Sequence, residues 1–312
     1  MAEFRAAYLS LLDSGELERR AGEARRRLER CDLCAWECRA DRLAGRLGVC
    51  QTGAVALVSS YGPHLGEEDP LRGWRGSGTI FFARCNLRCQ FCQNHDISQT
   101  DAGLPLDDEQ LAQIMLALQD EGCHNINLVS PTHVLAQIIE AVLLAARQGL
   151  RLPLVYNTGG YDSPGGLRLL DGIIDIYMPD MKYASAQTGQ RLSRVKNYPR
   201  VNQAAVLEMH RQVGDLQLDE NGLATRGLLV RHLLLPNGVS GVNDVVRFLA
   251  QAISPATYLN LMDQYHPEYN VRQNPHQYPQ LNRPVTRAEY QAAVQLAQAA
   301  GLTRLDPHPA LY

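Results

Sequence analysis

Apolar residues in the last three quarters of the chain form short blocks that are separated by segments with helical spacing. These blocks read as buried strands because they are short and rich in aliphatic and aromatic residues. They fall at 79–83, 126–129, 154–156, 173–178, 228–235 and 258–262. Between them the apolar positions repeat at three- and four-residue intervals, as at 111, 114, 115 and 118. The pattern therefore predicts an alternation of strands and helices.

Two of the expected helices carry an explicit start signal. Asp107 is followed three residues later by Gln110, and Thr286 by Glu289, which is the pattern of a capping box. Further helices are expected at 134–147, near 200–213 and near 243–253. Each of these segments is long enough to carry the chain from one strand to the next.

Strands separated by helix-length segments pair in parallel through right-handed crossovers. Six such units are too few for a full eight-stranded barrel. We therefore expect an α/β fold, a partial (β/α)6 TIM-like barrel with a small Cys-rich N-terminal extension. A doubly wound open sheet is the alternative, because periodicity does not separate the two. In both folds the active site forms at the C-terminal ends of the strands.

The N-terminal part has a different character. Residues 2–30 are rich in Ala, Arg, Leu and Glu and read as a charged helix, and a Cys-rich stretch follows at 31–50. A short β-like run at 54–58 precedes a Gly- and Pro-rich stretch at 62–78 that reads as a loop or linker. We accordingly divide the chain into an N-terminal helix and Cys-rich metal-binding extension at 1–78 and a barrel at 79–312.

Composition and charge narrow the range of partners. Apolar residues make up 45% and charged residues 20%, an ordinary globular composition. A net charge of -3 provides no field that would attract nucleic acid or an anionic membrane. The basic run at 25–27 with Arg30 is interleaved with Glu and reads as a solvated helix face. With no apolar segment typical of a signal peptide or a membrane span, the sequence predicts a cytoplasmic protein with reduced thiols.

Seven of the eight cysteines fall into two tight groups, which indicates metal ligation. Cys85, Cys89 and Cys92 follow the strand at 79–83 with C-x3-C-x2-C spacing. Three thiolates can hold three irons of a cubane cluster and leave the fourth open, whereas a structural zinc site takes four ligands. The eighth, Cys123, stands alone and reads as a small buried hydrophobe.

The first group has C-x2-C-x3-C-x11-C spacing and consists of Cys31, Cys34, Cys38 and Cys50. Four thiolates fully satisfy either a zinc ion or a second [4Fe–4S] cluster. The spacing does not decide between the two.

The main loop, Cys-Asn-Leu-Arg-Cys-Gln-Phe-Cys-Gln-Asn at 85–94, resembles the signature of the radical S-adenosylmethionine (radical SAM) superfamily. The amino-acid sequence of this loop is similar to that of pyruvate formate-lyase-activating enzymes. Further stretches resemble an uncharacterised branch named for that similarity, at 127–133, 156–161, 175–182, 208–215, 226–232 and 262–265. The likeness covers roughly residues 31–305, far more than a chance motif would.

The resemblance implies a [4Fe–4S] cluster whose open iron binds the amino and carboxylate groups of S-adenosylmethionine. One electron, from a donor such as flavodoxin or ferredoxin, then splits the sulfonium into methionine and a 5′-deoxyadenosyl radical that abstracts hydrogen from a substrate. The implied enzyme is a radical SAM oxidoreductase, with activation of a glycyl-radical enzyme as one candidate role.

Two alternatives stay open. The first is radical modification of another protein or of a small molecule, with the segment 266–282 as a lid or as a plain surface loop. The second is a non-catalytic iron–sulfur or zinc protein. Activators with extra clusters carry the added cysteines after the main loop, whereas this chain carries them before it, so the sequence departs from the activator pattern.

Four side chains near the ends of the first three strands are candidate contacts for S-adenosylmethionine. The resemblance implies that Phe91 packs near the adenine, a position that also suits a core aromatic residue. Ser130 stands where many family members carry a Gly-Gly-Glu stretch, which this sequence lacks; a strand-to-helix turn is the alternative. Asn157 and Thr158 suit ribose hydroxyls, although an Asx-capped turn fits them equally well.

Four more candidates follow the later strands. Asp180 and Lys182 occupy alternate positions and so point the same way, and similar Asp-x-Lys elements border the cofactor site in activating enzymes. Arg231 interrupts an apolar strand and needs an anion if it is buried, either the methionine carboxylate or Asp180. Gln264 comes just after the sixth strand and is a candidate cofactor or substrate contact.

Overall fold

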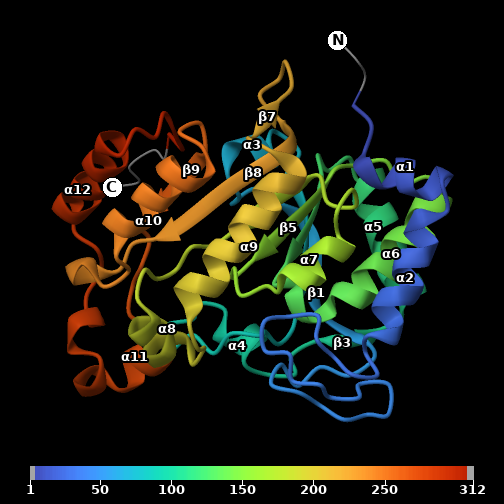
Figure 1. Cartoon of the computed structure of the whole chain (residues 1–312), viewed down its shortest axis with the longest axis horizontal. Helices are drawn as coiled ribbons and strands as arrows, with labels where there is room; N and C mark the ends of the chain where they lie inside the picture. Colours follow the sequence, from blue (N-terminus) through green and yellow to red (C-terminus); the bar gives the residue numbers. More distant parts are fainter. Residues whose placement is uncertain (1–3, 308–312) are drawn as a thin grey trace.

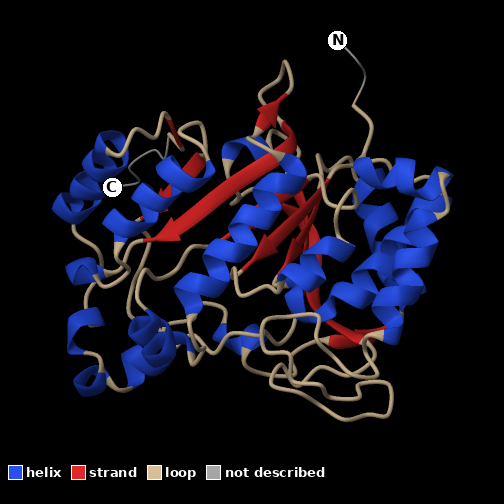
Figure 2. Cartoon of the chain, viewed as in Figure 1, coloured by secondary structure: helices blue, strands red, loops and turns tan. Residues whose placement is uncertain are grey.

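The computed structural model describes residues 4–307, and its centre is a ten-stranded sheet (Figures 1 and 2). The strands are hydrogen-bonded in the order β10-β9-β8-β6-β5-β4-β2-β1-β3, with β7 paired to β8 as a side branch. Their bounds are β1 Ala56–His64, β2 Ser77–Phe82, β3 Leu104–Leu106, β4 Ile126–Val129, β5 Leu154–Thr158, β6 Ile176–Pro179, β7 Gln217–Leu218, β8 Ala224–Leu233, β9 Tyr258–Met262 and β10 Arg304–Leu305.

The strand order decides between the two expected architectures. From β2 through β4, β5, β6, β8 and β9 to β10, neighbouring strands are parallel and follow one another along the chain. A doubly wound sheet would reverse its order at an internal point, and no reversal occurs in this run. The fold is therefore the expected partial barrel, with β10 at one edge and the antiparallel pair of β1 with β3 at the other.

The helices lie outside the strands, as Figure 2 shows. The two expected capping boxes are both present, at the starts of α5 and α12. The remaining helix expectations hold, except that the segment near 243–253 is α-helical only to Phe248 and continues as a π-helical turn. The helices that follow the strands are α5 Asp108–Asp120, α6 Leu135–Arg147, α7 Pro164–Leu169, α8 Ala186–Ser193, α9 Tyr198–Val213, α10 Val242–Phe248 and α12 Arg287–Ala299.

The N-terminal segment packs onto the barrel as two helices instead of the expected one. Gly15 has a positive φ of 75° and separates α1 (Ala7–Asp13) from α2 (Glu16–Arg26). Figure 1 shows both helices beside α6. The amide of Ala7 donates to Asp175 Oδ1 at 2.8 Å, and Tyr8 Oη donates to the carbonyl of Leu152 at 3.0 Å. These bonds join the start of the chain to the barrel.

The stretch 62–78 is more ordered than a linker. Strand β1 continues to His64 and pairs antiparallel with β2, and a short helix, α3, spans Asp69–Arg72. Only part of the Gly and Pro content lies in turns: Gly73 and Gly76 have positive φ between α3 and β2, whereas Gly62 and Pro63 lie within β1 and Pro70 within α3. The division of the chain near residue 78 stays a prediction, although β1 belongs to the same sheet as the barrel strands. Within 4–307, no helix combines the length and the apolarity that crossing a membrane requires.

A buried histidine ties the later strands together. His232 on β8 is fully buried, with Nδ1 2.5 Å from the carbonyl oxygen of Met181 and Nε2 3.1 Å from Ser240 Oγ. Burial lowers the pKa of His232 to about 4, even though the Met181 carbonyl favours the charged ring. The folded protein therefore holds this ring neutral at neutral pH.

Replacing His232 with Gln should make the protein less sensitive to acid. The unfolded chain takes up a proton at about pH 6.5, whereas the folded chain resists until about pH 4. The wild type therefore loses stability as the pH falls through this window, on the order of 3 kcal/mol from this ring. Denaturant unfolding at pH 7, 5.5 and 4.5 should show the free-energy gap between wild type and variant narrowing toward low pH.

His276→Gln is the matched control because His276 is exposed, and its gap to wild type should stay constant. Parallel stability curves for wild type and His232→Gln would contradict the assignment.

Candidate active site

The cysteine loop begins where β2 ends, at the C-terminal edge of the parallel strands. Arg84 makes the turn with a positive φ of 66°, and its amide donates to the carbonyl of Ile97 at 3.0 Å. The buried ring of His133 lies with Nε2 3.0 Å from the carbonyl oxygen of Ala83. The loop thus lies at the edge of the barrel where this fold forms its active sites.

Each thiol of the loop has a hydrogen-bonding neighbour. The amide of Leu87 donates to Cys85 Sγ at 3.4 Å. Cys89 Sγ lies 3.0 Å from Ser193 Oγ, and Cys92 Sγ lies 3.1 Å from Ser98 Oγ. Amide and hydroxyl donors beside sulfur favour the thiolate form, which is the form that binds metal.

Burial and charge act against each other on these thiols. Burial raises the pKa of Cys89 to about 12, although the ammonium of Lys182 opposes the rise. Burial also raises the pKa of Cys85, and the Leu87 amide opposes it. Thiols whose ionisation is opposed by burial become stable thiolate ligands once a metal centre supplies positive charge. The chemistry of this donor set therefore fits a metal cluster.

The arrangement fits a cluster better than a single ion. Among residues 4–307, no three Cys, His, Asp or Glu side chains converge on a point where they could hold one metal ion. A cubane differs from a single-ion site, because each thiolate binds a different iron. Three cysteines on one loop, whose thiols interact electrostatically with one another, suit that requirement.

A cavity of about 240 Å³ opens beside the loop and gathers seven of the eleven site residues that were predicted outside the first cysteine group. It is bounded on one side by the cysteine loop and on the other by the ends of β6, β8 and β9. The predicted residues that line it are Cys89, Phe91, Cys92, Asp180, Lys182, Arg231 and Gln264. Cys85 is not among its lining residues.

Asp180 holds the two cations of this cavity. Its carboxylate accepts from Lys182 Nζ at 2.6 Å and from Arg231 Nε at 3.1 Å. Arg231 also donates through Nη2 to Asn157 Oδ1 at 2.7 Å. Burial would raise the pKa of Asp180, but Lys182 and Arg231 hold it below its usual range. The anion that Arg231 needs is thus Asp180 in this structure.

Phe91 packs within an aromatic cluster at the wall of the cavity. Its ring meets those of Tyr265 and Tyr183 edge-on, with centroids 5.7 Å and 6.4 Å away. Tyr183 Oη in turn lies 2.7 Å from Ser193 Oγ, the neighbour of Cys89. The aromatic wall and the thiol environment therefore form one packed unit.

Other predicted contacts lie outside the cavity. Thr158 is buried and donates to Asp162 Oδ2 at 2.7 Å, in a network that also holds Thr132 and Tyr156. Ser130 adopts a left-handed conformation before the helical turn at Pro131–Val134, the turn role weighed as its alternative. Cofactor contacts of Ser130, Asn157 and Thr158 stay predictions.

The two glycines after β5 make room for protein atoms. A Cβ at Gly159 would lie 2.5 Å from Leu87 Cδ1, inside the cysteine loop. Gly160 has a positive φ of 74°, and a Cβ there would lie 2.3 Å from the carbonyl oxygen of Asp180. The glycine pair lets the loop after β5 pack against both halves of the site.

The first cysteine group lies in a compact stretch after α2. Cys31, Cys34 and Cys50 are buried, and all eight cysteines of the chain are free thiols. A Cβ at Gly48 would lie 2.4 Å from Cys38 Sγ, so this glycine is needed for the chain to pass close to the thiol. Burial raises the pKa of Cys34, and the other three thiols add to the rise. The four thiols are therefore close enough to interact, but within residues 4–307 no three of them converge on one metal position, and metal binding by this group stays a prediction.

This stretch contacts the main cysteine loop directly. Trp36 Nε1 donates to the carbonyl of Asn86 at 2.7 Å, and Arg88 Nη2 donates to the carbonyl of Val49 at 2.9 Å. The Asn86 side chain donates to the carbonyl of Tyr161 at 2.8 Å. The two cysteine groups are thus held against one another through Trp36 and Arg88.

The segment 266–282 covers the other side of the loop. Three of its groups bond to Gln90: the amide of Val271 to the Gln90 carbonyl, and the side chains of Asn270 and Tyr278 to Gln90 Oε1. Tyr269 stacks on His95 with centroids 4.7 Å apart. The segment packs on the cysteine loop through these contacts.

Sequence reasoning missed three parts of this region. Ser193 lies far from the loop in sequence, and no spacing signals its contact with Cys89. Gln90 looks like an arbitrary position inside the motif. Glu67 and Glu68 lie in the stretch that was expected to be a linker, yet their adjacent carboxylates were a signal that could have prompted a search for a partner cation.

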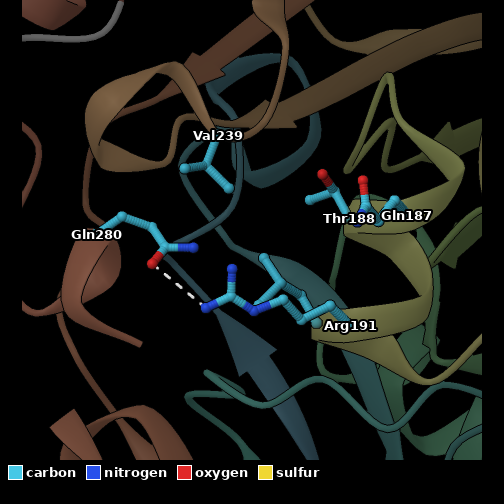
Figure 3. Close-up of a pocket in the computed structure, with 6 residues that line it drawn as sticks. Gln187, Thr188, Arg191, Val239 and Gln280 are labelled. Carbon is cyan, nitrogen blue, oxygen red and sulfur yellow. Dashed lines mark hydrogen bonds between the residues drawn. The ribbon is translucent and has the colours of Figure 1, made fainter. Parts of the chain in front are cut away.

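A different cavity, of about 260 Å³, lies beside α8 (Figure 3). Arg191 on this helix donates through Nη2 to Gln280 Oε1 at 3.3 Å, and its guanidinium carbon lies 5.7 Å from the ring centroid of Tyr278. None of the predicted site residues lines it. We therefore separate it from the candidate active site.

The chain was compared with protein families, with curated proteins and with solved structures. The family model described as "Radical SAM superfamily" matches residues 79–232. The uncharacterised protein MJ0674 of Methanocaldococcus jannaschii is 31% identical over 282 residues, 87% of this chain and 75% of that protein.

Two solved structures resemble the chain distantly, each with 13% identity and a TM-score of 0.42. In the structure titled "Native anSMEcpe with bound AdoMet", the match covers 66% of this chain and 61% of that one. In that of methylornithine synthase, it covers 100% of this chain and 86% of that one. On the strength of the family match and the curated relative, the chain belongs to the radical SAM superfamily, whose members bind a [4Fe–4S] cluster and S-adenosylmethionine and cleave the latter by a radical mechanism.

Proposed function

We propose that Cys85, Cys89 and Cys92 hold the [4Fe–4S] cluster and that S-adenosylmethionine binds in the cavity beside them. The observation that carries this proposal is that two of the three thiols line the same cavity as Asp180, Lys182 and Arg231. Soft thiolates and a charged, buried polar cluster facing one space are what a cluster and a zwitterionic cofactor require.

The residues of the cavity have distinct roles in this proposal. Arg231 and Lys182 offer positive charge to the carboxylate of the cofactor, while Asp180 keeps both cations in place. Gln264, at the cavity edge, offers amide groups to the ammonium or the ribose. The aromatic wall of Phe91 limits access of water to the cleavage site and provides a face for the adenine.

When bound, the cluster supplies the electron that splits the sulfonium and generates the 5′-deoxyadenosyl radical. The protein residues must bind the substrate with its hydrogen facing the same cavity, and they must keep water away from the radical. The segment 266–282 serves as the cover in this scheme, because Gln90 bonds it to the loop.

For the substrate we retain activation of a glycyl-radical enzyme beside radical modification of another protein or of a small molecule. We propose a low-potential donor such as flavodoxin or ferredoxin as the electron source, in the cytoplasm. For the first cysteine group we keep both a second [4Fe–4S] cluster and a zinc ion. The hydrogen bonds from Trp36 and Arg88 give either centre a structural role toward the main loop.

Cys89→Ala should abolish reductive cleavage of S-adenosylmethionine. The wild type, reconstituted anaerobically with iron and sulfide and reduced with dithionite, should form 5′-deoxyadenosine, and the variant should form less than about one hundredth as much. The reason is that the cluster loses one of its three ligands. Product is measured by chromatography after acid quenching.

Cys123→Ala is the matched control, since Cys123 is also buried but lies apart from both groups. It should retain cleavage. A wild type that takes up iron without cleaving the cofactor under several reductants would favour a non-catalytic iron–sulfur protein.

Cys34→Ala should identify the centre on the first cysteine group. With a second cluster, the wild type should hold about eight irons per chain and the variant about four. With zinc, the wild type should hold about four irons and one zinc, and the variant should lose the zinc alone. Metal analysis of both proteins after reconstitution distinguishes these cases, and iron that disappears entirely from the variant would contradict two separate centres.

A further inference from the structure

A second cavity adjoins the proposed cofactor site. Its volume is about 420 Å³, and it lies between the segment 65–72 and strands β8 and β9. Three residues, Arg231, Met262 and Gln264, line both this cavity and the one beside the cysteines. A molecule in the second cavity therefore borders the place where the radical would form.

The inner wall of this cavity carries two buried polar side chains with incomplete hydrogen bonding. Glu68 and Asn260 are only 8% and 6% exposed. Asn260 Nδ2 donates to Glu68 Oε1 at 2.9 Å, which fixes the orientation of the amide. Glu68 Oε2 and Asn260 Oδ1 have no hydrogen-bond partner. Both oxygens are buried on residues that line the cavity, so the cost of burying them is not compensated by a hydrogen bond within the chain.

Glu67 is a second glutamate that lines this cavity, next to Glu68. Its side chain is 9% exposed, and its Oε2 lies 3.7 Å from Arg231 Nη1, beyond hydrogen-bond distance. Burial raises the pKa of Glu67 to about 7, Arg231 opposes the rise, and the neighbouring carboxyl of Glu68 adds to it. A proton on Glu67 would let the two carboxyl groups bind each other, whereas two ionised carboxylates accept hydrogen bonds and supply none.

The positive charges around Glu67 and Glu68 do not balance their negative charge. The cavity is lined by the acids Glu67, Glu68, Asp69 and Asp306 and by the bases Arg72 and Arg231. Arg72 is bound to Asp69, with Nε 2.8 Å from Oδ1, and Arg231 is bound to Asp180 and Asn157. Arg231 also forms a longer ion pair with Glu67, at 3.7 Å, but the hydrogen bonds of both cations go to other groups. Two bases facing four acids leave the lining with excess negative charge, which favours a cation from outside.

We propose that Glu67, Glu68 and Asn260 bind the primary ammonium group of the substrate. An alkylammonium carries three N–H donors, which match a carboxylate oxygen of Glu67, Glu68 Oε2 and Asn260 Oδ1. A divalent metal ion fits less well, since no three acidic, Cys or His side chains within 4–307 converge on one point. The proposal rests on the proposed function only in calling the bound amine a substrate.

The geometry of β9 sets where the rest of the substrate lies. Asn260 and Met262 are two residues apart on one strand face, a rise of about 7 Å. An aliphatic chain anchored at Asn260 therefore extends past Met262 toward Gln264 and the cysteine cavity. A chain about as long as a lysine side chain would bring its far carbons to the radical. Both free alkylamines and lysine side chains of a peptide carry a primary ammonium group on such a chain.

The test uses n-pentylamine as probe and 1-pentanol as its uncharged match, with the full-length reconstituted protein. Calorimetric titration at pH 7.5 should show the amine binding at least tenfold more tightly than the alcohol. Glu68→Gln and Glu67→Gln should each remove that preference, while Asp69→Asn should keep it, since Asp69 lines the cavity but pairs with Arg72. Two glutamine variants guard against one failing to fold.

The outcomes separate this inference from the proposed function. Equal binding of amine and alcohol, or loss of the preference in Asp69→Asn, would overturn the ammonium site, even if 5′-deoxyadenosine still forms. If the wild type binds the amine but does not cleave S-adenosylmethionine, the ammonium site is supported and the proposed radical function is contradicted. Deuterium passing from perdeuterated n-pentylamine into 5′-deoxyadenosine would support the substrate role. Tighter binding of N-acetyl-lysine methylamide than of n-pentylamine would identify a peptide source.

Discussion

The ion pairs of Asp180 connect the strands that form the candidate active site. One carboxylate binds Lys182 just after β6 and Arg231 on β8, and Arg231 reaches on to Asn157 on β5. Three neighbouring strands are thereby joined at the edge that faces the cysteine loop. A buried ion pair of this kind adds little net stability, so its value lies in fixing the cations where a charged cofactor would meet them.

The sequence predicted the barrel well because its strands are short, apolar and separated by helices of ordinary length. The capping boxes at Asp107 and Thr286 gave the helix starts to the residue. The charge of Arg231 inside an apolar strand correctly indicated a partner anion, which is Asp180, while its contact with the cofactor stays a prediction. What escaped prediction depends on three-dimensional contact between distant segments. Ser193 beside Cys89, and Asn260 beside Glu68, have no local signature.

The stretch 62–78 shows the limit of composition as a guide. Its glycines and prolines indicated a loop, yet β1 runs into it and α3 lies within it. Between those elements the chain turns inward and carries Glu67 and Glu68 to the side of β9. Polar residues in an apparent linker are expected to be exposed, whereas Glu68 is buried and accepts a hydrogen bond from Asn260 on β9.

The contact between the two cysteine groups bears on how the protein is assembled. The N-terminal stretch is synthesised first. Trp36 and Val49 can form their hydrogen bonds only after Asn86 and Arg88 have been synthesised and β2 has formed. If both groups bind metal as proposed, these contacts would couple them, because ordering one stretch would also order the surface against which the other is held. Occupation of one centre would then raise the affinity of the other.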